Sequence, residues 1–257
     1  MNILLIGPPG SGKTTAACSG PKPAYLIDID GKAEQMQNLR EGIEKGDIYV
    51  HHIKSRLVTD RLSYRALHPD KPPKEEPEGY VEVVDLLNDI IEGTIAKEYP
   101  VIILDSLTRL VEHMKRLLIY HRGKGKFGKK KDEGDMNWPS WGSYLSNLEE
   151  LFNAVTVEMS DRHFICTAHQ KNLVERDPIT EVEIVKGYFP LVDGQMREKL
   201  AGYFNEVYYL ETKFQAGKPP IYQFRTIGKK HAARTSMGLA ELVEADLGTI
   251  FKENKIT

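Results

Sequence analysis

The residues with the clearest chemical meaning are residues 7–14, which read Gly-Pro-Pro-Gly-Ser-Gly-Lys-Thr. They match the pattern G-x-x-x-x-G-K-[ST], in which glycines let successive backbone N–H groups turn inward around phosphates. An apolar run at residues 3–6 precedes the loop and a helix-compatible stretch follows it, so a helix N-terminus would also face the anion. We therefore predict a nucleotide-binding loop made of Gly7, Pro8, Pro9, Gly10, Ser11, Gly12, Lys13, Thr14 and Thr15.

Within this loop, Lys13 and Thr14 have distinct expected roles. The ammonium of Lys13 can reach the β- and γ-phosphates, and the Thr14 hydroxyl can ligate Mg²⁺. The alternative is a glycine-rich turn that matches by accident. The strand-like run before the loop and the helix-compatible run after it disfavour that alternative.

A second part of the site is predicted at Asp105, which follows the apolar run of residues 101–104. A buried strand that ends in an acid brings a carboxylate to the carboxyl edge of a parallel sheet, where the Mg²⁺ of a bound nucleotide lies. Thr14 and Asp105 are therefore the predicted Mg²⁺ residues. Apolar runs ending in Asp are common, so an exposed acid at a strand end is the alternative.

Two acids, Asp28 and Asp30, end the apolar run that begins at residue 24. Because they are two residues apart, they would point to the same face of a strand. We prefer Asp30 as the residue that activates the attacking water, with Asp28 holding neighbouring groups. A plain turn at Asp30 and Gly31 is the competing interpretation.

A third strand end, after residues 164–167, carries His169 and Gln170. A polar side chain there can contact the γ-phosphate and transmit its presence to the segment that follows. His169 is the preferred sensor, although a lone histidine is often only hydrogen-bonded in place. The predicted catalytic residues are thus Lys13, Asp30, Asp105 and His169.

Apolar runs alternate with helical patterns along the chain, which favours an α/β fold with a mostly parallel central sheet and helices on both faces. Strands are predicted at residues 2–6, 24–29, 48–53, 101–104 and 164–167, and helices after the phosphate loop and at residues 32–41, 80–97, 107–120 and 138–159. Short strands at residues 205–211 and 221–226, joined by a Gly-Lys-Pro-Pro turn, predict an antiparallel C-terminal edge. We expect one domain over residues 1–257, with an exposed proline-rich and charged excursion at 68–79 and a mobile basic loop at 122–136.

Composition limits the classes of function. The 257 residues carry a formal charge of −2, so nucleic-acid binding would need a local basic patch rather than a global charge. Cys18 and Cys166 lack the close spacing of zinc ligands and are expected to be buried thiols in a reducing compartment. No signal-type segment and no run of 18 apolar residues is present, so we expect a cytoplasmic, soluble protein without membrane contact.

Together these strand ends resemble a RecA-type P-loop ATPase core, and more closely the phage nucleotide-binding proteins associated with single-strand annealing and recombination. The resemblance rests on the phosphate loop, on Leu-Ile-Asp-Ile-Asp at 26–30, on Ile-Ile-Leu-Asp-Ser-Leu-Thr at 102–108, on Trp-Pro-Ser-Trp-Gly at 138–142, on Thr-Ala-His at 167–169 and on Ala-Arg-Thr at 233–235. It implies ATP and Mg²⁺ as ligands, ATP hydrolysis that DNA stimulates, and single-stranded DNA as the partner.

By that resemblance, residues 122–136 fall where RecA-like proteins place a first DNA-contacting loop, and residues 170–200 where they place a second. Basic side chains flanked by glycines can follow a phosphate backbone, and an aromatic ring can stack on a base. The candidate DNA-binding residues are Arg122, Lys124, Lys126, Phe127, Lys129, Lys130 and Lys131. A solvated basic loop is the alternative, and the second loop is less convincing because acids accompany its basic residues.

RecA-like rings and filaments complete an ATP site with a cation from the next subunit, so the resemblance implies a homo-oligomer. Lys229, Lys230 and Arg234 are the candidates for this cation. Related proteins often have a lysine immediately before the arginine, where this chain has Ala233, so the choice among the three stays open. The leading subunit-docking segment of bacterial RecA is not seen before the first strand, so we expect assembly through other surfaces; a single-strand binding protein is a further candidate partner.

Two other functions fit the phosphate loop. A nucleotide or small-molecule kinase would use the same loop, but no arginine-rich lid segment is apparent and Asp105 lies far along the chain from Lys13. An ATP-dependent replication or helicase-loading accessory module, with slow turnover, is the third interpretation.

Overall fold

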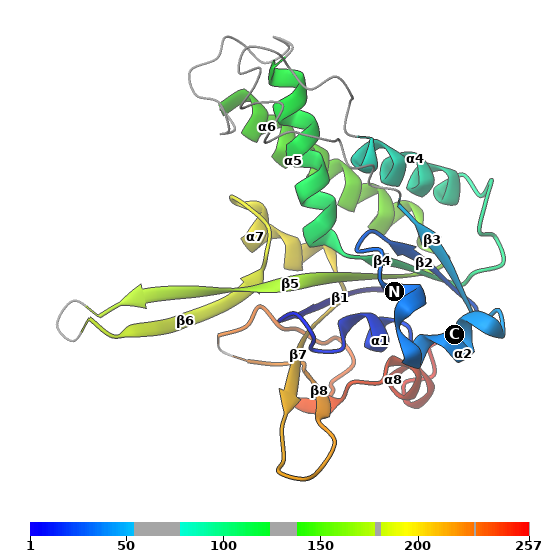
Figure 1. Cartoon of the computed structure of the whole chain (residues 1–257), viewed down its shortest axis with the longest axis vertical. Helices are drawn as coiled ribbons and strands as arrows, with labels where there is room; N and C mark the ends of the chain where they lie inside the picture. The colour runs from blue at the N-terminus through cyan, green and yellow to red at the C-terminus, as the bar shows by residue number, and fades with distance from the viewer. Residues whose placement is uncertain (54–77, 124–137, 178–180, 229, 257) are drawn as a thin grey trace.

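The computed structural model describes residues 1–53, 78–123, 138–177, 181–228 and 230–256 (Figure 1). Its strands are β1 (Asn2–Gly7), β2 (Ala24–Asp28), β3 (Ile48–His52), β4 (Val101–Asp105), β5 (His163–Arg176), β6 (Glu183–Pro190), β7 (Glu206–Lys213), β8 (Ile221–Arg225) and β9 (Leu242–Glu244). Its α-helices are α1 (Lys13–Ala17), α2 (Gln37–Glu44), α4 (Gly79–Ile91), α5 (Leu107–Gly123), α6 (Trp138–Asn153), α7 (Met196–Lys199) and α8 (Leu247–Glu253).

The strands form one sheet in the order β3-β2-β4-β5-β1-β7-β8-β9, with β6 paired to β5. The six strands from β3 to β7 in this order are parallel to their neighbours, whereas β8 and β9 add to the edge in antiparallel fashion. The predicted fold class is therefore confirmed. Parallel strands end at the same edge, and β5 lies between the phosphate-loop strand β1 and the Asp105 strand β4.

Helices cover both faces of this sheet because its central strands are apolar on both sides. Within β1, Leu4 and Ile6 pack with residues of α4, α5 and α6, whereas Ile3 and Leu5 pack with residues of α1, α2 and α8. Figure 1 shows these two helical layers on opposite sides of the sheet. A strand that is buried on both faces reads as a continuous apolar run, which is why the core strands were predictable.

Helix ends differ from the predictions for local reasons. The helix predicted at 80–97 ends at Ile91, because Gly93 adopts a positive φ of 67° that terminates it. The helix predicted at 32–41 divides into a 3₁₀ turn, Ala33–Gln35, and α2, and the one predicted at 138–159 becomes α6 and a π-helical turn, Ala154–Glu158. Helix α5 extends through Gly123, so Arg122 is helical rather than part of a loop.

The largest error concerns β5, which was predicted to end at residue 167 and continues to Arg176. Its outer half pairs with β6 in an antiparallel hairpin that extends away from the body of the sheet (Figure 1). Of the segment 170–200, the described residues 170–177 and 181–200 therefore form mainly a two-stranded ribbon and a short helix instead of the predicted loop. The ribbon contains charged residues interspersed with the exposed apolar residues Leu173, Val174 and Ile184. Its sequence therefore lacks the alternation of apolar and polar residues that identifies a half-buried strand.

The C-terminal elements β9 and α8 were not predicted. Helix α8 begins where the Asp246 side chain accepts a hydrogen bond from Gly248 N at 2.9 Å, an N-cap that the sequence shows only locally. Both cysteines are buried and free, as expected. None of the described helices combines the length and the apolar character needed to span a membrane.

Candidate nucleotide-binding site

The phosphate loop connects β1 to α1 in a conformation that requires glycine. Gly10 and Gly12 have φ values of 76° and 86°, in the left-handed region that side chains disfavour. Gly12 is the N-cap of α1, so the N–H groups at the start of this helix border the loop. A side chain at Gly7 would also collide with Ser11, since its Cβ would lie 2.6 Å from Ser11 Oγ.

Lys13 folds over this loop. Its Nζ donates to Gly7 O at 3.1 Å and to Pro8 O at 2.9 Å, and the side chain is buried. Burial lowers the pKa of Lys13, and the negative charges of Asp105 and Asp30 oppose this effect. The cation is therefore held at the loop, with two carboxylates nearby.

Thr14 and Asp105 meet across the site. Thr14 Oγ1 donates to Asp105 Oδ2 at 2.7 Å, and Thr167 at the end of the inner part of β5 donates to Asp105 Oδ1. Asp105 is 4% exposed, and burial raises its pKa against the opposing effect of the two hydroxyl hydrogen bonds. Thr167 was missed as a site residue, although the Thr-Ala-His motif placed it at a predicted strand end.

Asp30 lies beside the segment that follows Asp105. Its Oδ1 accepts from Ser106 Oγ at 3.2 Å and is 3.5 Å from Arg109 Nε. Arg109 also pairs with Glu112, with Nη1 2.7 Å from Oε2. Ser106, Arg109 and Glu112 were not predicted as site residues. They lie within seven residues after the strand-end acid Asp105, and Ser106 is part of the Asp-Ser-Leu-Thr motif.

Asp28 has a structural role at the same strand end. Its two carboxylate oxygens accept from Gly31 N and Ala33 N, each at 2.8 Å, and His52 Nδ1 lies 3.2 Å from Oδ2. Asp28 thus forms the turn after β2, in which Gly31 has a φ of 69°, as in the competing interpretation of a turn at Asp30 and Gly31. This turn also directs Asp30 toward Ser106.

His169 lies opposite Gly7 in the β1–β5 register. Its backbone N donates to Thr108 Oγ1 at 3.0 Å, and its carbonyl accepts from Leu191 N at 2.6 Å. Burial lowers the pKa of the imidazole, with Lys13 adding to the effect and Asp30 opposing it. The alternative sensor, Gln170, instead donates along the ribbon to Asn172 at 2.9 Å.

Tyr222 on β8 is a further neighbour of the loop that sequence analysis missed. Its ring would lie 3.3 Å from a Cβ placed on Gly12, so the ring packs against the loop backbone. No sequence pattern links Tyr222 to the loop, because β8 and the loop are more than 200 residues apart in sequence. An aromatic ring beside a phosphate loop is suited to contact the base or ribose of a nucleotide.

The donor set fits a Mg²⁺–nucleotide ligand. A hydroxyl and a carboxylate at Thr14 and Asp105 are hard oxygen ligands of the kind that Mg²⁺ takes together with phosphate oxygens. Ser11 Oγ is a buried polar atom without a hydrogen-bond partner among the described residues, and it lies at the loop that would surround the phosphates. The residues present thus fit such a ligand, with oxygen ligands for the metal at Thr14 and Asp105 and a hydrogen-bond donor for the phosphates at Ser11.

One family model matches most of the chain. The family model described as "AAA domain" matches residues 1–235. This chain belongs to the AAA domain family. No curated protein matches it.

Two solved structures are similar to this AAA domain at low identity. The flagellar accessory protein FlaH from Methanocaldococcus jannaschii has 14% identity and a TM-score of 0.38, with 94% of this chain and 82% of that chain covered. A KaiC-like protein from Pyrococcus horikoshii has 13% identity and a TM-score of 0.43, with 95% and 88% covered.

The remaining predicted residues of this AAA domain contact β6 or β7 or lie outside the described residues. Lys230 Nζ donates to Val185 O on β6 at 2.9 Å, and the exposed Arg234 pairs through its backbone with Val207 on β7. Lys229, residues 54–77 and residues 124–137 lie outside the described residues; these include the excursion up to residue 77 and the basic loop from Lys124 onward. Glu78 precedes α4 directly, and Gly79 is its first residue.

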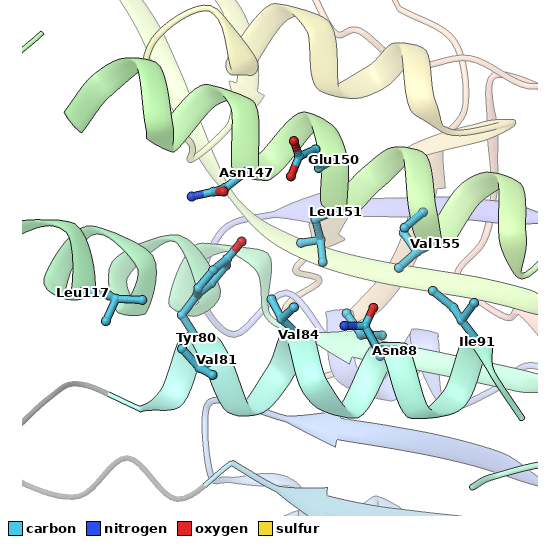
Figure 2. Close-up of a pocket in the computed structure, with 12 residues that line it drawn as sticks. Tyr80, Val81, Val84, Asn88, Ile91, Leu117, Asn147, Glu150, Leu151 and Val155 are labelled. Atoms are coloured by element: carbon cyan, nitrogen blue, oxygen red, sulfur yellow. The ribbon is translucent and has the colours of Figure 1, made fainter. Parts of the chain in front are cut away.

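A groove of about 360 Å³ lies between α4 and α6, away from the phosphate loop. Figure 2 shows Tyr80, Val84 and Asn88 of α4 facing Glu150 and Leu151 of α6. None of its lining residues was predicted as a site residue. The residues predicted for the phosphate loop and for catalysis instead converge where β1, β2, β4 and the inner part of β5 end.

Proposed function

We propose that this chain is an ATPase of the RecA type that acts on single-stranded DNA in phage-type annealing or recombination. The observation that carries the hydrolysis site is the 2.7 Å hydrogen bond from Thr14 Oγ1 to Asp105 Oδ2, which joins the phosphate loop to the acid of β4 across 91 residues. Membership of the AAA domain family supports nucleotide binding and hydrolysis. The DNA-binding role rests on the resemblance and on the basic composition of residues 122–131.

In this proposal each residue at the strand ends has one role. Lys13 neutralises β- and γ-phosphate charge, and Thr14 and Asp105 hold Mg²⁺, which when bound neutralises charge on the phosphate oxygens. Asp30 orients and deprotonates the attacking water. The lowered pKa of His169 favours the neutral imidazole, which contacts the γ-phosphate. Binding of the γ-phosphate would then shift the β5–β6 hairpin through the hydrogen bond from Leu191 N to His169 O.

Assembly completes the proposal. We expect a homo-oligomer in which Lys229, Lys230 or Arg234 of one copy reaches the ATP site of the next. The exposed side chain of Arg234 and its position on an ordered β7-paired segment favour it over Lys230, whose ammonium is bound to Val185 O. A single-strand binding protein is a further proposed partner.

The stimulation of hydrolysis by DNA tests the function as a whole. We expect single-stranded DNA to raise kcat for ATP hydrolysis, and replacement of Lys129, Lys130 and Lys131 by Ala to weaken DNA binding. Each lost phosphate contact should reduce the magnitude of the slope of log affinity against log salt concentration by about 0.7. The slope of the triple variant should therefore be smaller in magnitude by about 2 than that of the wild type. Fluorescence anisotropy with a labelled oligonucleotide at several salt concentrations measures both quantities.

The matched control replaces three exposed lysines elsewhere, Lys97, Lys218 and Lys252, by Ala. If the control and the triple variant bind DNA equally well, the basic loop is not the DNA site. Phosphate transfer to a nucleoside monophosphate, indifferent to DNA, would instead identify a kinase. ATP binding with turnover that DNA does not change would favour the accessory module.

Tyr222 gives a separate prediction about nucleotide affinity. If its ring contacts the base, Tyr222→Ala should raise KM for ATP about tenfold, since stacking on an aromatic side chain contributes about 1–3 kcal/mol per base. The value of kcat should change less than about twofold, because the contact is the same in the ground and transition states. Tyr222→Phe, which keeps the ring, should behave as the wild type; a loss of kcat at unchanged KM in Tyr222→Ala would contradict this role.

A further inference from the structure

Arg109, a residue without a role in the proposed site, lies against the carboxylate that is proposed to activate water. Its Nε is 3.5 Å from Asp30 Oδ1, and its Nη1 is 2.7 Å from Glu112 Oε2. One guanidinium therefore joins Asp30 at the end of β2 to Glu112 in α5. A lysine would present one point charge in place of a planar fork, so it would not reproduce the separate Nε and Nη1 contacts.

Ser106 adds a second contact to the same oxygen of Asp30. Its Oγ donates to Asp30 Oδ1 at 3.2 Å. A carboxylate that is held through one oxygen by a hydroxyl and a guanidinium cannot rotate freely about its Cβ–Cγ bond. Oδ2 is then the oxygen that neither Ser106 nor Arg109 contacts.

The helix that carries Arg109 is anchored in the core. Leu107, Leu110, Val111 and Met114 of α5 are 0–3% exposed. Arg109 lies on the outer face of the same turns, where its side chain is 44% exposed. The guanidinium thus starts from a backbone that packing holds in place, which a positioning role requires.

We infer that Arg109 is a positioning residue that, with Ser106, holds Asp30 Oδ1 so that Oδ2 faces the attacking water. This inference rests on the proposed function, because it assumes that Asp30 is the base. Without Arg109 the carboxylate samples other rotamers, and a smaller fraction of bound ATP has a correctly placed base. The expected loss is in kcat and not in affinity for ATP.

A double-mutant cycle in the whole 257-residue chain tests this inference. We expect Arg109→Ala to lower kcat for ATP hydrolysis about tenfold, with KM within about twofold of wild type. Asp30→Asn should lower kcat about 100-fold. In the Asp30→Asn background, Arg109→Ala should change kcat by less than about twofold, because the residue through which Arg109 acts is already lost.

Two further variants exclude simpler explanations. Arg109→Lys retains the charge without the fork and should recover part of the lost kcat, whereas Arg116→Ala, at an exposed arginine of the same helix, should match wild type. Thermal unfolding of each variant separates lost positioning from lost folding.

The outcomes separate this inference from the proposed function. Equal losses on Arg109→Ala in the wild-type and Asp30→Asn backgrounds, or a change in KM alone, would overturn the positioning role while the ATPase assignment stands. Full activity in Asp30→Asn would remove Asp30 as the base, and the role of Arg109 with it. A wild-type protein that does not hydrolyse ATP would contradict the proposed function itself.

Discussion

Replacement of Lys13 by Ala is expected to lower kcat for ATP hydrolysis by at least about 100-fold, because no other described cation lies on the phosphate loop to neutralise transition-state charge. The effect should exceed that of any surface substitution. The Lys13 ammonium donates hydrogen bonds to Gly7 O and Pro8 O. It is therefore already at the loop that would surround the phosphates. Release of inorganic phosphate, measured with and without single-stranded DNA, gives the rate.

The controls for this experiment separate chemistry from folding and from DNA binding. Lys252→Ala, at an exposed position of α8, should retain the wild-type rate. Lys13→Ala should still bind a labelled oligonucleotide in the absence of nucleotide, since the basic loop is a different segment. A Lys13→Ala protein that hydrolyses ATP at the wild-type rate would show that the phosphate loop is not the hydrolysis site.

Replacement of Asp105 by Asn is expected to lower kcat about 100-fold while leaving the protein at least as stable as wild type. The rate falls because the amide binds Mg²⁺ poorly, so the metal loses one of its two protein ligands. The stability is kept because the new amide can still form hydrogen bonds with the Thr14 and Thr167 hydroxyls, and because a carboxylate whose pKa burial raises is costly to keep ionised. Loss of function without loss of stability is the signature of a functional acid.

Two measurements check this expectation. Steady-state hydrolysis over a Mg²⁺ titration should show a higher Mg²⁺ requirement in Asp105→Asn, and the midpoint of thermal unfolding without nucleotide should equal or exceed that of wild type. Asp85→Asn, at an exposed acid of α4, is the matched control and should change neither. A clear drop in the unfolding midpoint of Asp105→Asn at neutral pH would mean that the ionised carboxylate mainly stabilises the fold.

The local features of this protein were readable in its sequence. The glycines of the phosphate loop, the continuous apolar runs of β1, β2 and β4, and the acid at the end of β4 all depend on residues that are neighbours in sequence. Backbone conformation and two-sided burial impose these patterns directly, since only glycine adopts the loop's positive φ at low cost. For the same reason the α/β fold class and the antiparallel edge at β7 and β8 were predicted correctly.

Only the tertiary structure decided which side chains meet. The hydrogen bonds from Thr14 and Thr167 to Asp105, and from Ser106 to Asp30, join residues 91, 62 and 76 positions apart. The order of the strands brings them together, and strand order follows from the packing of the whole sheet. The β5–β6 ribbon was missed for a related reason, because its outer strands are stabilised by each other and not by a core whose pattern the sequence displays. The sequence by itself thus determined the phosphate loop and the core strands, whereas the tertiary structure decided how Asp105, Asp30 and Arg109 are held around it.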